Sequence, residues 1–573
     1  MASGLNFYPQ VSQVMPWMAS FPFPTEANKA TKRTPRIPPK SGNNFSPGSV
    51  IRLEVPATGY MNPNHTFLEM DVTMISAVLN SGPAASPPNA NTLTTRFQNG
   101  IGSIFQRIRV MYGSTPLEDI PEYNELLRYL SDHTSTNTNG LMDQTSIADG
   151  VGGYTVSSDG AGANFGLVNV RQKYIQGNCS SFAGIADPGP NPTADFTNGA
   201  SLGQVPGDSS NPGMFTTNGQ PVCTRRYVIS LMLGLLIQNK LIPVKYMASA
   251  FAIELTLANP QNCMIVSSTG LVPAHPTALV SPPSYGVTNV NLLPELLEYD
   301  NEFDNAFQQG LATNGVPILY ASWNKFSYSS GLGSNLTFHI QERSRSIKGI
   351  VCLQKRQVPG YFWDTGASFF DTSVDGAGTL QSFQYRAGGV YMPAAPVQTS
   401  APGSNKSNGA AEAYIENQKM LAIVGDYRLQ TNASNLTWGL QSGIHGAQTG
   451  VLGEFDYKYT TTTLSLDNSP NLVEVNSGNN AFCGDLPSQQ FGMAMSFETT
   501  NGLEISGLNS QEQNDISITA IYSAPQVTGF SSTASAFNIF TFFDSLLVLK
   551  AFNVSFEFNF RKWIWFNKVC GDC

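Results

Sequence analysis

Two cysteines near the end of the printed chain have the spacing best suited to metal chemistry. Cys570 and Cys573 form a CxxC pair, which is half of a common zinc-binding arrangement. A tetrahedral zinc site needs four ligands, and the sequence has no second CxxC pair and no histidine close to this one. We therefore interpret the pair as structural or incidental and expect no metal site and no cofactor.

Histidine side chains could act as general bases, but each of the five stands alone in the sequence: His65, His133, His275, His339 and His445. His339 follows Leu336 and Phe338 and precedes Ile340, so it lies on the opposite face of a predicted strand from these apolar residues. A general base must lie within hydrogen-bond reach of the proton that it takes. Because no reactive group is paired with any histidine, we interpret all five as solvated or packed.

Carboxylates gather in DNEFDN, residues 300–305, which lacks the glycine and the distal glutamate of an EF-hand calcium loop. We interpret this run as the polar face of a helix. A glycosidase needs two carboxylates at a defined separation, and the sequence neither excludes nor singles out such a pair. The glycine-rich DGVGGY and DGAGAN are not followed by a helical pattern, which favours mobile loops over phosphate binding. We expect no catalytic residue and no enzyme activity.

Alternation of apolar and polar residues predicts the strands that would position any site. In LIPVKYMASAFAIELTLANP, Phe251, Ile253, Leu255 and Leu257 share one face, which predicts a half-buried strand. Leu68, Met70, Val72 and Met74 alternate in the same way. Further strands are predicted in VIRLEV, IFQRIRVMY, RYVISLMLGLL, PILYASWNKFSY, NLTFHIQERSRSIKGIVCLQ, FGMAMSFET, ISITAIY and NVSFEFNF.

Short helices are predicted at three places. Residues 116–130 space Ile120, Tyr123, Leu127 and Leu130 as one helical face. A second helix is predicted to begin near Pro294, because Pro suits a first helical turn and the face Tyr299, Phe303, Phe307 and Leu311 follows. The third covers residues 411–421.

The composition favours an all-β protein of more than one domain. The chain has 573 residues, only 12% of them charged, and contains 52 Gly and 36 Pro. Each half shows strands, a short helix, a polar insertion and more strands, which fits two β-sandwiches with Greek-key connections. We expect an extended N-terminal arm at 1–48, a first sandwich at 49–282 with an insertion at 131–222, and a second at 283–573 with an insertion at 431–490.

The net charge of −9 gives no reason to expect bulk attraction to nucleic acid. The arm is the exception, because five cations outweigh Glu26 and leave +4 there against −13 elsewhere: Lys29, Lys32, Arg33, Arg36 and Lys40.

RKWIWFNK, residues 561–568, could stack on bases, although we favour a terminal strand that docks in a core or a neighbouring subunit. The odd number of cysteines and the lack of a signal peptide favour synthesis in a reducing intracellular compartment. No apolar run is long enough to span a membrane.

Four phrases, met in the same order along the chain, resemble those of double jelly-roll major capsid proteins, most closely the polinton-like virus and virophage branch. RIRVMYGSTPLEDIPEYNELL resembles the strand and helix of the first domain, and LIPVKYMASAFAIELTLANP resembles the strand pair that closes it. ILYASWNKFSY with IQERSRSIKGIVCLQKR resembles the start of the second domain. FQYRAGGVYMPAAPV followed by AEAYIENQKML resembles the strand and helix of that domain.

The resemblance implies two jelly rolls side by side in each chain, with three chains forming a pseudo-hexagonal capsomer. Such capsomers would tile an icosahedral shell around double-stranded DNA, made in the host cytoplasm or nucleus, with penton and minor capsid proteins as partners. We expect the insertions on the outside and the arm on the inside, where its cations contact DNA or acidic proteins. A chain beginning at Asn44 is expected to trimerise but to assemble poorly. The alternatives are a glycan-binding or glycan-cleaving β-sandwich protein and a viral penton or spike.

Overall fold

The computed structural model describes most of two β-sandwiches and the elements that join them. The described residues are 30–75, 93–97, 101–134, 154–158, 165–169, 222–238, 240–247, 249–268, 282–313, 315–329, 335–356, 373–374, 378–399, 411–424, 458–460, 480–482, 491–498, 505–511, 515–522, 535–550 and 553–557. Among them, no helix is both long enough and apolar enough to cross a lipid bilayer.

The first sandwich consists of two antiparallel sheets. One has the order β1-β13-β4-β10, with β2 also paired to β13, and the other has the order β3-β11-β6-β7. Their bounds are β1 (Ala30–Arg33), β2 (Asn44–Phe45), β3 (Val50–Val55), β4 (Tyr60–Ile75), β6 (Phe105–Tyr112), β7 (Thr115–Pro121), β10 (Val222–Ser230), β11 (Phe251–Leu257) and β13 (Ser284–Tyr299).

The second sandwich is built in the same way. One sheet has the order β14-β24-β16-β22, with β25 added to β24, and the other has the order β15-β23-β18, with β17 and β19 both paired to β18. Their bounds are β14 (Val316–Ser329), β15 (Asn335–Ile340), β16 (Ile347–Arg356), β17 (Ser373–Val374), β18 (Gly378–Ala387), β19 (Val390–Gln398), β22 (Met493–Ser496), β23 (Ile516–Tyr522), β24 (Ser535–Lys550) and β25 (Asn553–Glu557).

Short helices and short strand pairs lie between these strands. The helices are η1 (Ile101–Ile104), α3 (Tyr123–Thr134), α7 (Gly234–Ile237), η3 (Val244–Tyr246), α8 (Pro260–Cys263), α9 (Asn301–Thr313) and α10 (Ala411–Val424). Three further strand pairs are β5 (Leu93–Phe97) with β12 (Met264–Ser268), β8 (Tyr154–Ser158) with β9 (Phe165–Asn169), and β20 (Lys458–Thr460) with β21 (Asn480–Phe482).

Both sandwiches share one strand order. With β1 and β2 counted together as the first strand, the eight principal strands of each sandwich pair as 1-8-3-6 in one sheet and 2-7-4-5 in the other. This is the arrangement of a jelly roll, which closes eight strands into two facing sheets. In each sandwich a helix follows the fifth strand, α3 after β7 and α10 after β19. The expected architectural duplication and the all-β class are therefore confirmed.

Two expected domain limits differ from this pairing. The expected arm ended at residue 48, but Ala30–Arg33 pairs with β13 and so supplies the first strand of the first sandwich. The expected second sandwich began at residue 283, but β13 pairs with β4 and is the eighth strand of the first sandwich. Pro294 did not start a helix because it lies inside β13, at an irregularity between Leu293 and Glu295 where a missing amide hydrogen is tolerated.

The helices begin later than the sequence predicts in two of three places. Residues 115–121 form β7, so the helix expected from residue 116 begins only at Tyr123. The second helix begins at Asn301, because Asp300 caps it by accepting a hydrogen bond from the Phe303 amide at 3.1 Å. The third prediction is confirmed, since α10 begins at Ala411.

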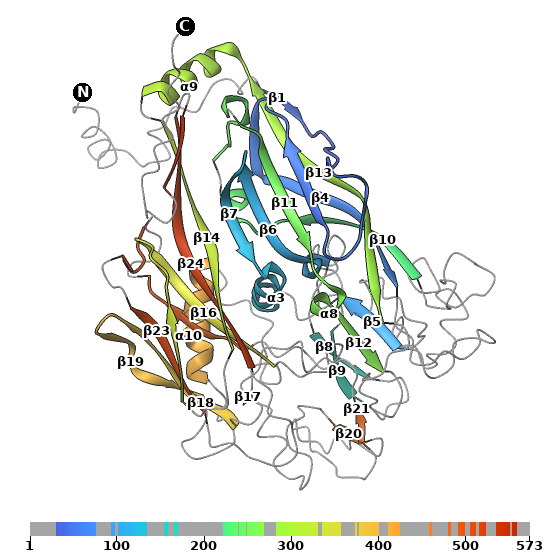
Figure 1. The fold of residues 1–573 in the computed structure, drawn as a ribbon, viewed down its shortest axis with the longest axis vertical. Helices are drawn as coiled ribbons and strands as arrows, with labels where there is room; N and C mark the ends of the chain where they lie inside the picture. Colours follow the sequence, from blue (N-terminus) through green and yellow to red (C-terminus); the bar gives the residue numbers. More distant parts are fainter. Residues whose placement is uncertain are drawn as a thin grey trace, which may run out of the picture.

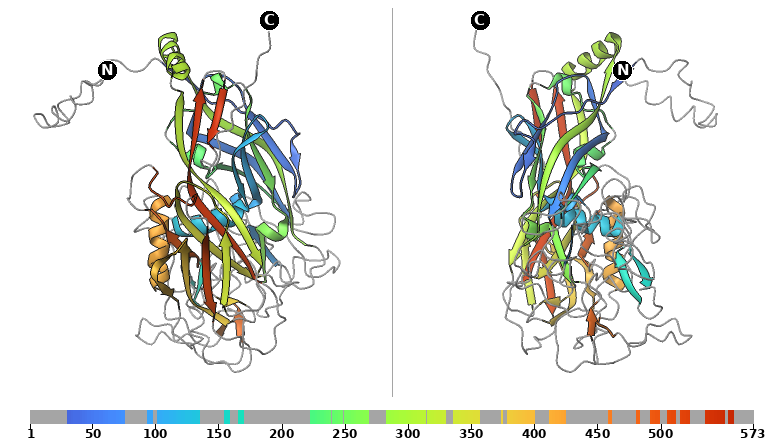
Figure 2. Two further views of the ribbon diagram at one scale, coloured as in Figure 1. Left: turned by 60° about the vertical axis from the view of Figure 1, so that its left-hand side comes forward. Right: turned by 90° about the vertical axis from the view of Figure 1, so that its right-hand side faces the viewer.

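Alternation correctly located the core faces of the long strands. Leu68, Met70, Val72 and Met74 are at most 2% exposed. In β11 both faces are covered, because Ala252 is fully buried and Glu254 is only 9% exposed, whereas the sequence predicted one solvated face. Figures 1 and 2 show the two sandwiches standing next to each other, with α3 between them and α9 at one end.

Candidate assembly surfaces

The residues singled out for chemistry lie apart from one another in the structure. His339 Nδ1 is 2.9 Å from Asp515 Oδ1 on the exposed face of β15, as the strand pattern predicted. His65 Nδ1 is 3.0 Å from Glu295 Oε2 on the first sandwich. Within the described ranges, no three His, Cys, Asp or Glu side chains are grouped to hold a metal ion. Residues 149–153, 159–164 and 561–573, which include Cys570 and Cys573, lie outside the described residues.

The acidic run at the start of α9 has a structural role. Asp300 caps the helix and Glu302 is exposed in its first turn. Asp304 points inward, where it accepts a hydrogen bond from the Tyr60 hydroxyl at 2.9 Å and contacts the Lys245 ammonium. Burial opposes ionisation of Asp304, but these two partners outweigh it, so the pKa of Asp304 lies below its ordinary value.

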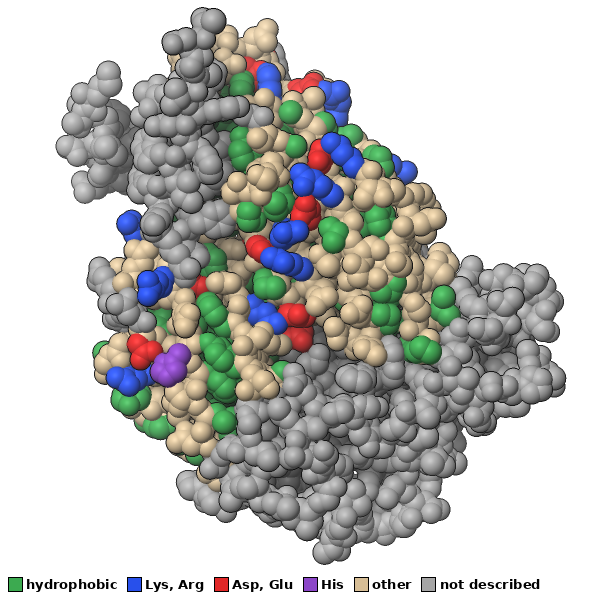
Figure 3. Space-filling model, viewed as in Figure 1, with side chains coloured by type: hydrophobic (Ala, Val, Ile, Leu, Met, Phe, Trp, Pro, Cys, Tyr) green, Lys and Arg blue, Asp and Glu red, His purple; other side chains and the backbone are tan. Residues whose placement is uncertain are grey.

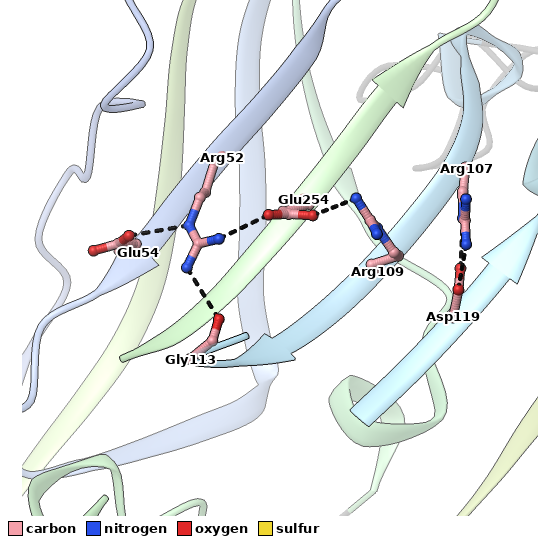
Figure 4. Close-up of polar contacts among 7 residues, drawn as sticks. All are labelled: Arg52, Glu54, Arg107, Arg109, Gly113, Asp119 and Glu254. Carbon is pink, nitrogen blue, oxygen red and sulfur yellow. Dashed lines mark hydrogen bonds and ion pairs between the residues drawn. The ribbon is translucent and has the colours of Figure 1, made fainter. Parts of the chain in front are cut away.

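A row of paired charges crosses the sheet that contains β3, β11 and β6 (Figure 4). Arg52 of β3 contacts Glu254 of β11 at 2.8 Å, and Arg109 of β6 contacts the other oxygen of Glu254 at 2.7 Å. Arg52 also contacts Glu54 at 3.0 Å, and Lys40 contacts the second oxygen of Glu54. The hydrogen bond from Lys40 is the largest cause that lowers the pKa of Glu54. Glu254 is therefore enclosed between two guanidinium groups.

Neighbouring strands continue this pattern. Arg107 of β6 donates a hydrogen bond from Nε to Asp119 of β7 at 2.7 Å. The same hydrogen-bonded carboxylate raises the pKa of Arg107. Figure 3 shows positive and negative side chains alternating in a band over the first sandwich. Each charge in these pairs has an opposite charge within its own chain, so this face presents little net charge to a partner.

The described basic part of the expected arm contacts both sheets of the first sandwich. Its cations contact carboxylates of β4, β13 and β3, as the pairs Lys32–Glu295, Arg33–Glu298, Arg36–Glu69 and Lys40–Glu54 show. Each of the four described cations thus has a carboxylate partner within the chain and keeps 57–70% of its side chain exposed, and the expected contact with DNA or acidic proteins stays a prediction. Lys29 lies outside the described residues.

One buried carboxylate joins the two sandwiches. Glu118 of β7 accepts a hydrogen bond from Ser322 of β14 at 2.9 Å and from the backbone amides of Gly234 and Leu235 at 2.8 and 3.1 Å. Next to it, the Tyr320 hydroxyl of β14 donates to the Leu117 carbonyl at 2.8 Å. No sequence pattern identified this contact, because Glu118 belongs to the segment that was read as a helix.

Helix α3 forms a second contact between the sandwiches. Glu125 accepts a hydrogen bond from Asn538 of β24, and Tyr129 donates one to Asn417 of α10. One apolar cluster contains residues of both sandwiches, and its members from the second sandwich include Val351, Leu353, Met420, Leu421 and Phe540. Because close-packed interiors do not deform continuously, we infer that the two sandwiches form one rigid unit.

Sequence comparison gives no relatives of this chain, since no family model and no curated protein matches it. Among solved structures, the chain matches the Sputnik virophage structure determined by cryo-EM with a TM-score of 0.50 at 11% identity, covering 94% of this chain and 91% of that one. It matches the Faustovirus major capsid protein with a TM-score of 0.48 at 9% identity, covering 94% and 93%. It matches the mavirus major capsid protein with a TM-score of 0.46 at 10% identity, covering 95% and 93%. The first match agrees with the double jelly-roll fold derived from the strand pairing.

Proposed function

We propose that this double jelly-roll chain is a structural major capsid protein of the polinton-like virus and virophage branch. The observation that carries the proposal is that two sandwiches of identical strand order are fused through one apolar cluster. A chain built in this way is a rigid pair of similar wedges. In the proposed capsid, function lies in the contacts that these wedges make rather than in a catalytic site.

Three-fold symmetry turns three such pairs into six similar wedges, which form a pseudo-hexagonal capsomer. Closed rings of identical subunits are the usual outcome of specific self-association. We therefore propose an obligate homotrimer whose subunit contacts each bury on the order of 2,000 Å² or more. Capsomers of this shape can tile an icosahedral shell around double-stranded DNA, with penton and minor capsid proteins at the remaining positions. The protein would be made in the host cytoplasm or nucleus.

We propose that the insertions 131–222 and 431–490 form the outer surface of the capsomer. Most of these residues lie outside the described ones, but each insertion contributes one described strand pair, β8 with β9 and β20 with β21. Both pairs lie toward the end of the molecule opposite α9 (Figure 1). If that end faces outward, then α9 and the beginning of β1 face the interior of the shell, which is the side proposed for residues 1–29.

The alternative functions have less support. A glycan-binding or glycan-cleaving site would place free carboxylates beside exposed aromatic rings. The rings of Tyr60, Phe303 and Phe307, which lie close to one another near Asp304, do not meet this requirement, because Asp304 is 9% exposed and contacts Lys245. A penton would usually need one jelly roll, whereas this chain has two.

Light scattering and negative-stain microscopy of the purified full-length chain test the proposal together. We expect particles of three times the chain mass of 61.8 kDa with a hexagonal outline. A stable monomer at micromolar concentration, or a ring of five subunits, would contradict it. Mild proteolysis of assembled particles should cut first in the two insertions, and cleavage confined to β11 would contradict their outer placement.

A further inference from the structure

Five aromatic rings form one cluster where β13 passes into α9: Tyr60, Tyr246, Tyr299, Phe303 and Phe307. The ring centroids of Tyr299 and Phe303 are 4.3 Å apart, and those of Tyr60 and Phe307 are 5.2 Å apart. Tyr60 at the centre is 2% exposed, whereas Phe303 at the rim is 41% exposed. The cluster therefore has a buried base and a rim of Tyr299, Phe303 and Phe307, which is exposed at Phe303 and half-buried at the other two, and which we name the α9 rim.

Polar contacts hold the α9 rim in place. Asp304 accepts a hydrogen bond from Tyr60 and contacts Lys245, so α9 is tied to β4 and η3. Asp300 fixes the first turn through the Phe303 amide. Because these groups are positioned before any partner arrives, a ligand that covers the rim would not need to order it.

The direction of β1 shows where the preceding segment enters. β1 runs antiparallel to β13, with Ala30 opposite Tyr299 and Arg33 opposite Leu296. Ala30, where the described chain begins, therefore lies beside Tyr299, at the end of β13 that passes into Asp300 and α9 (Figure 1). Residues 1–29 lie outside the described residues, and they join the described chain beside the α9 rim.

The composition of that segment suits an aromatic surface. Residues 21–24 read FPFP. Proline restricts both itself and the preceding residue to extended or polyproline II backbone. Proline-rich segments of this kind bind aromatic-lined surfaces at low entropic cost, because their backbone is already ordered.

The lengths also agree. Residues 21–24 lie six to nine positions before Ala30, which corresponds to a reach of roughly 20–32 Å for an extended chain. The 13 residues of α9 span about 20 Å. The FPFP segment is therefore long enough to reach any part of the α9 rim of the same chain.

We propose that the α9 rim is the docking site for residues 21–24 of the same chain. Phe21 and Phe23 pack against Phe303 and Tyr299, and Pro22 and Pro24 keep the segment extended along the helix. This docking does not depend on the capsid function, because all of its parts belong to one chain.

Photo-crosslinking of the full-length protein tests this placement. Phe21 is replaced by the photo-reactive benzoylphenylalanine, and this chain is produced together with a second version that lacks the photo-reactive group and carries Asn305→Gln as a mass tag. After irradiation, mass spectrometry identifies the crosslinked peptides. We expect adducts within residues 299–307 of the photo-reactive chain itself. Adducts mainly on the N305Q chain, or mainly outside residues 299–307, would overturn the proposal.

Two substitutions make the test specific to the rim. Phe303→Ala removes the most exposed ring and should lower the crosslinking yield roughly fivefold, whereas Phe303→Tyr keeps a ring and should retain the yield. Tyr391→Ala is the matched control, because Tyr391 of β19 is 53% exposed and lies on the second sandwich. An equal yield from Phe303→Ala and Tyr391→Ala would overturn the proposal.

Discussion

Ser322, on the first strand of the second sandwich, donates a hydrogen bond to Glu118 of the first sandwich, with 2.9 Å between Oγ and Oε1. Glu118 is 1% exposed, and burial raises its pKa to about 7, although the three hydrogen bonds that it accepts act in the opposite direction. A titratable group thus lies at the junction of the two sandwiches. Its protonation links the stability of that junction to pH.

The free energy of unfolding should depend on pH through Glu118. Its pKa is about 7 in the folded chain against 4.5 for an ordinary glutamate, so the folded state binds the proton more tightly. The tighter proton binding by Glu118 stabilises the folded chain; this contribution is fully present below pH 4.5 and is lost as the pH rises through about 7. Glu118→Gln should remove this dependence. Urea unfolding of both proteins between pH 4.5 and 8 measures it, and parallel curves would contradict the prediction.

Gly234→Ala should loosen the contact between the sandwiches. An added Cβ would lie 1.7 Å from the Ala321 carbonyl oxygen, so the backbone of β14 would have to move. We expect a loss of about 2–3 kcal/mol in the free energy of unfolding. Gly310→Ala is the control, because that position in α9 is open and alanine should stabilise the helix by about 1 kcal/mol. Equal effects of the two substitutions would show that crowding at Gly234 is unimportant.

Glu254→Ala should destabilise the first sandwich by about 2 kcal/mol. It leaves Arg52 and Arg109 facing each other across β11 without the carboxylate that bridges them. Glu298→Ala breaks the Arg33 pair, which is much more exposed, and should change stability by less than about 0.5 kcal/mol. Chemical denaturation of both variants checks this ranking, and a smaller loss for Glu254→Ala would be contrary to it.

Asp300→Ala should lower stability by about 1 kcal/mol through loss of the α9 cap. Glu302→Ala and His339→Ala change exposed groups and should fall within about 0.5 kcal/mol of the unmodified chain. All three variants should still trimerise. A turnover activity that disappears with any one of them while trimers persist would contradict a purely structural role.

Two truncations should distinguish the contribution of residues 1–29 from that of β1. A chain that begins at Ala30 keeps β1 and should still trimerise, but it lacks the segment proposed to dock on the α9 rim and should give fewer shells at matched trimer concentration. A chain that begins at Asn44 loses β1 and the paired hydrogen bonds between Ile37 and Leu292, and should lose more than about 3 kcal/mol. This replaces the expectation that such a chain still trimerises. Equal shell yields from the full chain and the Ala30 truncation would show that the arm is not an assembly element.

The long strands could be predicted from the sequence because burial of one face imposes alternation, as in β4. The first strand could not, because all four residues of β1 are exposed and its place depends on pairing with β13. Asp300 was an available signal for the start of α9, but Pro294 competed with it. The burial of Glu118 could not be predicted, since it depends on α7 and β14, which are distant in sequence.

In both sandwiches the first strand pairs with the last, β1 with β13 and β14 with β24. Neither sheet can therefore close while the ribosome is still making its final strand. At about 5–20 residues per second, completion of the second sandwich lags behind that of the first by on the order of ten seconds or more. During this interval the strands of the first sandwich are all available in a nascent chain, whereas β14 still lacks its partner strand β24. Any contact that needs the complete second sandwich, as those of the proposed trimer do, must therefore wait until β24 has been made and has paired with β14.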